Sequence, residues 1–182
     1  VNVYFRSRER TKELEEKGIH VISSSIEGDS VDIPAVAAIA SPVRDKSTRY
    51  IVDLGGNDVG TMVLGRLKPL LDTAETDFFM VVNVNRPNTS SPEGILEEMK
   101  SLEDASGLRV TGLINNTNLI RETTAENIAM GDKILKEASR LSGVPIKYTT
   151  YVEEVMQDAE KLPDDLGGEL FPLKFYMRKD WM

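Results

Sequence analysis

The sequence predicts an α/β fold, a three-layer sandwich with a mostly parallel sheet. Short, almost wholly apolar segments rich in β-branched residues alternate with longer segments of helical periodicity, which is the pattern of consecutive βαβ units. Strands that are apolar on both faces are typical of parallel sheets, because helices cover those faces. The length of 182 residues suits one domain, so residues 1–182 are expected to form a single domain with a substantial core.

The expected elements begin with a helix at residues 6–17. Gly18 would end this helix in the C′ position, and the apolar residues 19–23 would form the strand that follows. Residues 34–40 are expected to form a short helix. Residues 50–54 are apolar and β-branched and predict a buried strand.

The middle of the chain predicts two helices around a strand at residues 78–84. The first helix spans about residues 58–72, where leucine and valine recur on one face. The second begins at the cap Ser91 with Pro92 in its first position, and Gly107 ends it.

The last part of the chain predicts a strand at residues 110–115 and then a long helix. Thr123 and Glu126 would form its capping box, and Gly143 would end it. Four further segments complete the expected order: a strand at 146–150, a helix at 152–161, a turn at 163–168, and an apolar tail at 170–182 whose residues 175–182 suggest an edge strand or docking segment.

Composition and charge exclude several classes of function. The chain has 40% hydrophobic and 29% charged residues and no apolar run near the ~18 residues of a membrane span, so a cytoplasmic protein is expected. Its net charge of −8 argues against nucleic acid and anionic membranes as partners. Cysteine is absent, which excludes disulfides and cysteine-bound clusters. The single histidine, His20, lies in an expected strand and is interpreted as structural.

One candidate site follows the expected strand at residues 50–54. The strand ends at Asp53, and Gly56 follows three residues later. A carboxylate at a strand end can hold the water shell of Mg²⁺, and glycine lets a backbone N–H approach a phosphate. The alternative is that Asp53 only closes a strand and that Gly55 and Gly56 only make a turn, because so short a motif recurs by chance. Asn57 and Asp58 are further candidates beside it.

Two other places carry polar residues after an apolar strand. Asn115 and Asn116 follow the expected strand at residues 110–115, and an asparagine amide suits the N6/N7 edge of adenine. Asparagines that make turns are the alternative there. Arg86 follows the strand at residues 78–84 and could meet an anion, although pairing with a neighbouring carboxylate is the favoured interpretation.

Together these segments resemble the deviant P-loop ATPases related to the MinD/ParA, CobQ/CobB and nitrogenase iron-protein families. Residues 52–60 are similar to their switch II, which implies that Asp53 is the catalytic residue acting on Mg²⁺ through water and that Gly56 meets the γ-phosphate. Residues 112–116 are similar to their G-x-x-x-N strand end, which implies that Asn116 rather than Asn115 reads adenine. The opening residues 2–9 are similar to an N-P-Y-F-R-S-R-E segment of bacterial ATP-binding proteins in this group, near switch I.

The chain departs from this family in two respects. Val3 stands where proline is expected, and no G-x-x-x-x-G-K-[ST] loop occurs anywhere in the sequence. The chain also begins with valine, so a fragment is expected: the C-terminal portion of a P-loop ATPase domain whose N-terminal strands are missing. Such a piece is expected to bind ATP poorly and to have negligible ATPase activity.

The resemblance implies ATP and Mg²⁺ as cofactors and an ATP-dependent switch or slow ATPase as the function of the parent protein. Its partner would be a protein that the sequence does not identify, with a homodimer as an alternative. The missing cysteines exclude the cluster chemistry of the iron protein, and the acidic balance counts against the DNA-binding ParA branch. A nucleotide-independent interaction module is the alternative function, and an amidotransferase or synthetase of the CobQ/CobB type is a third.

Overall fold

The computed structural model describes residues 10–22, 47–55, 58–71, 75–154, 156 and 159–175. The contacts divide the chain into two compact units. Unit 1 comprises Val1–Thr76 with Asp104–Leu108, and unit 2 comprises Asp77–Glu103 with Arg109–Met182. The helix predicted at residues 34–40 lies outside the described residues.

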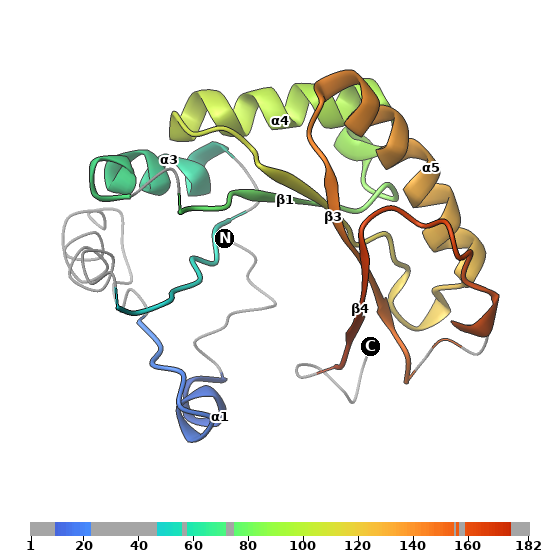
Figure 1. Cartoon of the computed structure of the whole chain (residues 1–182), viewed down its shortest axis with the longest axis horizontal. Helices are drawn as coiled ribbons and strands as arrows, with labels where there is room; N and C mark the ends of the chain where they lie inside the picture. The colour runs from blue at the N-terminus through green and yellow to red at the C-terminus, as the bar shows by residue number, and fades with distance from the viewer. Residues whose placement is uncertain are drawn as a thin grey trace. The chain divides into compact units, whose positions relative to one another are not determined.

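Unit 2 contains a four-stranded sheet in which all neighbouring strands are parallel (Figure 1). Its spatial order follows the chain order, β1-β2-β3-β4. The strands are β1 (Phe79–Val82), β2 (Gly112–Asn115), β3 (Ile146–Val152) and β4 (Glu169–Leu173). This arrangement confirms the α/β class and the parallel sheet predicted from the apolar strands.

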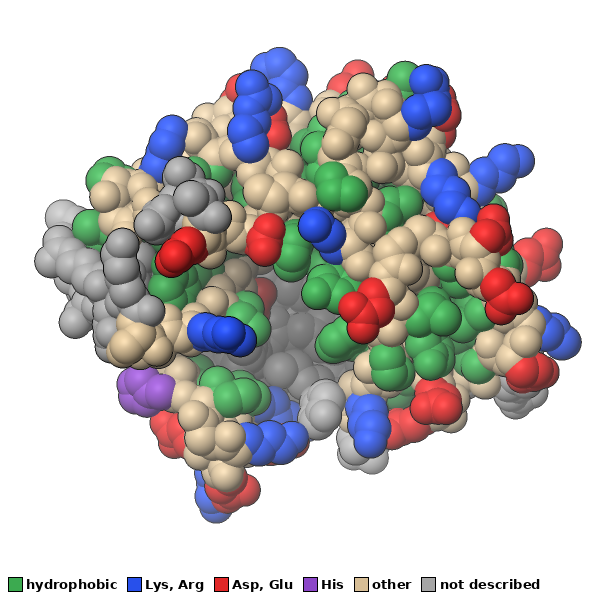
Figure 2. Space-filling model, viewed as in Figure 1, with side chains coloured by type: hydrophobic (Ala, Val, Ile, Leu, Met, Phe, Trp, Pro, Cys, Tyr) green, Lys and Arg blue, Asp and Glu red, His purple; other side chains and the backbone are tan. Residues whose placement is uncertain are grey.

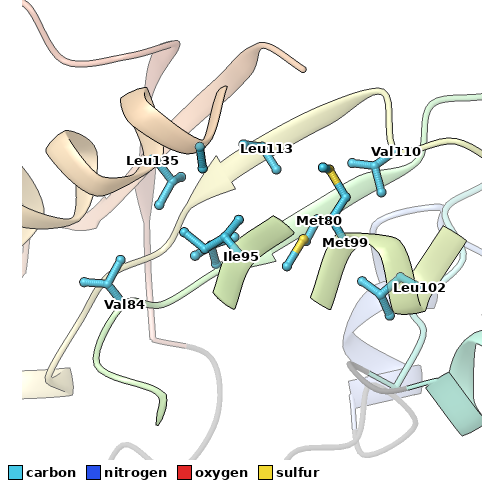
Figure 3. Packing of buried hydrophobic residues seen from close by; sticks show 10 residues of the cluster. Met80, Val84, Ile95, Met99, Leu102, Val110, Leu113 and Leu135 are labelled. Carbon is cyan, nitrogen blue, oxygen red and sulfur yellow. The ribbon is translucent and has the colours of Figure 1, made fainter. Parts of the chain in front are cut away.

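Two long helices connect the strands and cover one face of this sheet. Helix α4 (Pro92–Ser106) joins β1 to β2, and α5 (Ala125–Ser142) joins β2 to β3. Because consecutive parallel strands are neighbours and such crossovers have a constant hand, both helices fall on the same side. Their apolar faces meet the strands in one core (Figure 3), formed by Met80, Val82, Val84, Ile95, Met99, Leu102, Val110, Leu113, Leu135 and Ala138.

The opposite face of the sheet carries a row of aromatic rings. Phe79 and Tyr148 meet edge to face with their centroids 6.1 Å apart, and Tyr148 meets Phe171 in the same way at 5.7 Å. Val81 on this face is 59% exposed. Since α4 and α5 are the long helices described in unit 2, its described part has two layers, one of helices and one of strands.

The ends of α4 are formed by the residues that the sequence singled out. Ser91 Oγ accepts a hydrogen bond from the N–H of Gly94 at 3.2 Å, and Pro92 is the first helical residue. Gly107 has a positive φ of 67°, a conformation that suits glycine after the last helical turn.

The start of α5 lies one residue later than predicted. Its capping box uses Thr124 and Asn127, whose side chains bond reciprocally to each other's backbone N–H. The Thr123 hydroxyl is engaged elsewhere, accepting from the N–H of Leu119 at 2.9 Å and donating to the carbonyl of Ile120 at 2.7 Å. The prediction of Thr123 with Glu126 was therefore wrong. Gly143, with φ of 73°, ends the helix as expected.

Unit 1 contains the predicted first helices in shortened form. Helix α1 (Thr11–Glu16) ends before Gly18, whose φ of 79° confirms the C′ glycine. Helix α3 (Asp58–Leu67) continues as a 3₁₀ turn (Lys68–Leu70), because Pro69 has no N–H for the α-helical ladder. None of the helices in the described ranges is long and apolar enough to cross a membrane.

Two predicted strands and one predicted helix are absent from the described residues. Residues 19–22 and 50–54 form no strand, and Ile51 is 97% exposed, because an apolar pattern does not supply the hydrogen-bonding neighbour that a strand needs. The predicted helix at 152–161 was also wrong. Strand β3 continues through Tyr151 and Val152, which pair with β4, and the described residues that follow up to 161 form a turn at 153–154 and a 3₁₀ turn (Ala159–Lys161).

The last strand of the described sheet lies just before the predicted C-terminal segment. Strand β4 covers Glu169–Leu173 and is the edge strand among the four described strands, so the prediction of an edge strand or docking segment at residues 175–182 stays untested. Residues 176–182 lie outside the described part of the chain.

Candidate functional site

The carboxyl ends of β1, β2 and β3 bring together a set of polar side chains, which we term the carboxyl-edge cluster. Ligands of parallel α/β sheets bind beyond this edge, because the loops that leave the strands there are not used for packing. The cluster consists of Asn83, Asn115, Asn116, Thr117, Asn118 and Thr150.

Asn115 serves the fold, because both ends of its amide are occupied inside the protein. It is completely buried, its Nδ2 donates to the carbonyl of Ile128 at 3.2 Å, and its Oδ1 accepts from the N–H of Thr117 at 3.1 Å. These bonds fasten the end of β2 to the first turns of α5. A ligand would have to break them to reach the amide, which costs about 1–3 kcal/mol for each buried group left unpaired.

Asn116 is held in a different way. Its backbone N–H donates to the carbonyl of Val82 in β1 at 2.8 Å, and its Oδ1 accepts from the hydroxyl of Thr150 in β3 at 2.8 Å. The side chain is half-buried, and its Nδ2 donates no hydrogen bond to any residue that the structure describes. Asn116 therefore presents an oriented amide with an unused donor.

The loops around Asn116 are fixed to each other by further asparagines. The side-chain amides of Asn83 and Asn85 donate to the carbonyl of Asn118 at 3.1 and 3.2 Å. Thr89 Oγ1 donates to the carbonyl of Asn83 at 2.8 Å. The loop after β1 is thus joined to the loop after β2, which gives the edge around Asn116 a defined shape.

Ile120, in the loop between β2 and α5, has a left-handed backbone with φ of 59°. This conformation is unfavourable for a β-branched residue by about 1–2 kcal/mol. Asn118 Oδ1 accepts from the N–H of Ile120 at 3.2 Å, and the Thr123 hydroxyl donates to its carbonyl, so the loop imposes it. Sequence reasoning missed Ile120 because isoleucine carries no turn signal. Strain of this kind is concentrated at ligand-binding and switch regions.

Arg86 lies on the loop after β1 with an exposed side chain. Within the described part of the chain its guanidinium makes no ion pair or hydrogen bond, and its backbone forms the turn that starts at Asn83. The predicted pairing with a neighbouring carboxylate is therefore not present among these residues. Its charge remains available to an anion.

The predicted phosphate and metal residues lie in unit 1. Asp53 is exposed, Gly55 is half-buried, and the segment from 51 to 55 has no regular secondary structure. Gly56 and Asn57 lie outside the described residues, and Asp58 is the first residue of α3. Asp53 makes no hydrogen bond or ion pair with another described residue, so its carboxylate is available.

A resident metal site does not occur among the described residues, where no group of three acidic, histidine or cysteine side chains comes together. A role for Asp53 towards Mg²⁺ does not require three protein ligands. Mg²⁺ keeps several waters and takes inner ligands from nucleotide phosphates, so one available carboxylate can act through its water shell. The donor set therefore suits a metal that arrives with a nucleotide.

A second polar cluster lies where α5 meets the loop before β4. Asp132 is buried, accepts from the N–H of Gly167 at 2.8 Å, and pairs with Lys136 Nζ at 2.8 Å. The hydrogen bond with Asp132 raises the pKa of Lys136 above its ordinary value. Since Asp132 is fully engaged, this cluster stabilises the loop and offers no open group to a ligand.

Comparisons with known proteins add no family to this description. No family model matches the chain, and searches of curated proteins and of solved structures found no match. On the face shown in Figure 2, Lys and Arg side chains are interspersed with Asp and Glu. The chain is defined by its parallel α/β sheet and by the polar residues at the carboxyl edge.

Proposed function

We propose that this chain is part of an ATP·Mg²⁺-binding switch of the MinD/ParA/CobQ type, in which Asn116 contacts the adenine base. The observation that carries the proposal is the half-buried amide of Asn116 at the carboxyl edge of a parallel sheet, with an unused donor among the described residues. An amide with one donor and one acceptor matches the N7 acceptor and N6 donor of adenine.

A role for the segment around Asp53 towards phosphate and Mg²⁺ is a separate part of the proposal and rests on its similarity to switch II. Its exposed carboxylate suits the water shell of Mg²⁺. Glycine has no side chain to obstruct the approach of a phosphate to the backbone, which is the role that the resemblance implies for Gly56, with Gly55 beside it in the sequence. Hydrolysis by a P-loop protein also needs a lysine that neutralises the phosphates, and the sequence contains no loop of that type. We therefore expect millimolar rather than micromolar affinity for ATP and no measurable turnover.

The proposal is tested by titrating the ¹⁵N-labelled chain with Mg·ATP and following the amide signals by NMR. We expect shifts of the Asn116 side-chain amide and of residues 53–55, and weaker binding in the Asn116→Ala and Asp53→Ala variants. Asn88→Ala is the matched control, because Asn88 is an exposed asparagine on the loop after β1 and lies outside the cluster. It should bind as the wild type does.

Two results would overturn different parts of the proposal. Saturation with millimolar Mg·ATP without any shift at Asn116 would remove the adenine site. Micromolar affinity in calorimetry would contradict the expectation that the phosphate-cradling loop is needed.

A nucleotide-independent interaction module is the second candidate, and the sheet itself favours it. Among the described residues, no strand pairs with the outer edge of β1, and Val81 and Phe171 are exposed on the aromatic face. Such an edge is a template for a strand from a partner. This function predicts that Val81→Glu abolishes partner binding while Asp53→Ala leaves it unchanged, whereas the ATP switch predicts that Asp53→Ala removes its nucleotide dependence.

A further inference from the structure

We infer that Thr150 fixes the orientation of the Asn116 amide and thereby sets the selectivity of the site for adenine over guanine nucleotides. This inference rests on the proposed function and extends it to a residue outside the D-x-x-G and asparagine motifs. Thr150 would act through Asn116, as a positioning residue that does not itself touch the base.

The first support is the position of Thr150 in the sheet. The pairing of β2 with β3 ends at Asn115 and Thr149, and β3 then continues to Val152. Thr150 is the first residue of β3 beyond the end of its pairing with β2. Its side chain therefore lies beside Asn116, the residue that follows β2.

The second support is that Asn116 is held from both neighbouring strands. The N–H of Asn116 is bonded to Val82 of β1, and its side-chain oxygen accepts the Thr150 hydroxyl of β3. The Thr150 hydroxyl also lies 3.2 Å from the carbonyl of Asn115. It carries one proton, and the shorter distance of 2.8 Å assigns that proton to Asn116. Thr150 is itself buried, so its hydroxyl has little access to water and depends on this bond.

The chemical consequence concerns which end of the amide faces a ligand. Asn116 Oδ1 is turned towards β3, where one of its two lone pairs accepts from Thr150, and Nδ2 is left for an acceptor. Adenine offers an acceptor at N7 and a donor at N6, which match Nδ2 and the remaining lone pair of Oδ1. Guanine offers two acceptors at the same edge, so an amide held in this orientation sets Oδ1 against one of them, whereas an amide free to rotate could turn Nδ2 towards either acceptor.

The test compares Thr150→Val with Thr150→Ser in the complete chain. Valine has nearly the shape of threonine but cannot donate, whereas serine keeps the hydroxyl. NMR titrations with Mg·ATP and Mg·GTP give the ratio of the two affinities, which we expect to fall at least about fivefold in Thr150→Val because a bidentate amide contact discriminates between bases by that order. Thr150→Ser should stay within about twofold of the wild type.

The ratio of the ATP and GTP affinities distinguishes failure of this inference from failure of the proposed function. A wild-type chain without preference for ATP over GTP would overturn the adenine assignment, and with it the selectivity. A wild-type preference that persists in Thr150→Val would overturn the role of Thr150 alone. A merely structural role would lower both affinities together and leave their ratio unchanged.

A measurement on the ligand-free chain tests the role of Thr150 independently of nucleotide binding. In the ligand-free chain, loss of the Thr150 hydroxyl should shift the two Nδ2 proton signals of Asn116, because the amide loses its fixed orientation. Unchanged signals in Thr150→Val would overturn the inference whatever the nucleotide affinities are. If valine prevents folding, Thr150→Ala serves in its place, and the same changes are expected.

Discussion

Gly131 in α5 illustrates how closely one residue can determine the packing around the carboxyl-edge cluster. A Cβ atom added at Gly131 would collide with the Thr117 hydroxyl, lie 2.6 Å from the Thr117 Cβ, and lie 3.0 Å from Asn115 Oδ1. Thr117 and Asn115 are buried and cannot move away cheaply. Glycine is otherwise unfavourable inside a helix by roughly 0.5–1 kcal/mol. Close approach of α5 to the end of β2 therefore requires glycine at this position.

We predict that Gly131→Ala lowers the free energy of unfolding by about 1–3 kcal/mol, because overpacking exceeds the gain in helix propensity. Urea denaturation followed by circular dichroism measures the change. Met130→Ala in the same helix is the control, since Met130 is exposed, and it should change stability by less than about 0.5 kcal/mol. A stabilised Gly131→Ala protein would show that α5 is not held this close to β2.

Lys136 gives a prediction for alkaline pH. Its pKa is raised, chiefly by the hydrogen bond with Asp132, so the charged lysine stabilises the folded chain. A group whose pKa is raised on folding contributes fully below its unfolded value of 10.5, and the contribution is lost as the pH rises through the folded value. Because Lys136 is exposed, the contribution should stay below about 1 kcal/mol.

The measurement is urea unfolding of the wild type and Lys136→Gln at pH about 8, below the unfolded value, and at pH about 11.5, above it. We expect the wild type to be the more stable at the lower pH and the difference to be smaller at the higher one. Lys133→Gln, an exposed lysine of the same helix, should show no such pH dependence. A difference that is equal at both pH values would contradict an ionic origin.

At the scale of single residues, the sequence separated Asn116 from Asn115 only through a family resemblance. The physical difference between them is their environment: Asn115 bonds to Ile128 and Thr117, whereas Asn116 bonds to Thr150. These partners lie 2 to 34 positions away in the sequence. Local patterns cannot indicate such pairings, and Thr150 was missed for this reason.

At the scale of elements, the end signals of α4 and the stop of α5 were predicted well because such signals are local, whereas the helix predicted at residues 152–161 was wrong. Ser91, Gly107 and Gly143 all act at the helix ends where they were expected. The strand segments at residues 19–22 and 50–54 were not confirmed, since a strand depends on a neighbour that its own sequence does not specify. The one-residue error at the start of α5 arose because Thr123 and Thr124 are equally good caps by residue type.

The two threonines provide a test at this scale. Thr124→Ala should destabilise the chain by about 1 kcal/mol, because it removes the acceptor for the N–H of Asn127. Glu126→Ala should change stability by less than about 0.5 kcal/mol, since Glu126 is exposed and is not the capping-box partner. Thermal unfolding of both variants measures this. A larger loss of stability in Glu126→Ala than in Thr124→Ala would instead support the capping box predicted at Thr123 and Glu126.

At the scale of the whole molecule, the sequence predicted the class and the direction of the sheet, but not the division into two units. Apolar strands alternating with helices specify a parallel sheet whatever the details. The division depends instead on which contacts each segment makes. All ten residues of the main core belong to unit 2, which holds Asp77–Glu103 and Arg109–Met182. The candidate phosphate residues, beginning with Asp53, belong to unit 1.

This division predicts that residues 77–182 fold without the preceding part of the chain. The fragment keeps the complete sheet, α4, α5 and the carboxyl-edge cluster, so its unfolding should be cooperative. We expect a circular dichroism spectrum typical of an α/β protein and a single unfolding transition in urea. The Asn116 side-chain amide should give the same NMR signals as in the complete chain, because the described hydrogen-bond partners of this residue, Val82, Asn118 and Thr150, lie within the fragment. A fragment that is unfolded, or whose Asn116 signals differ, would show that the sheet and its candidate adenine site depend on unit 1.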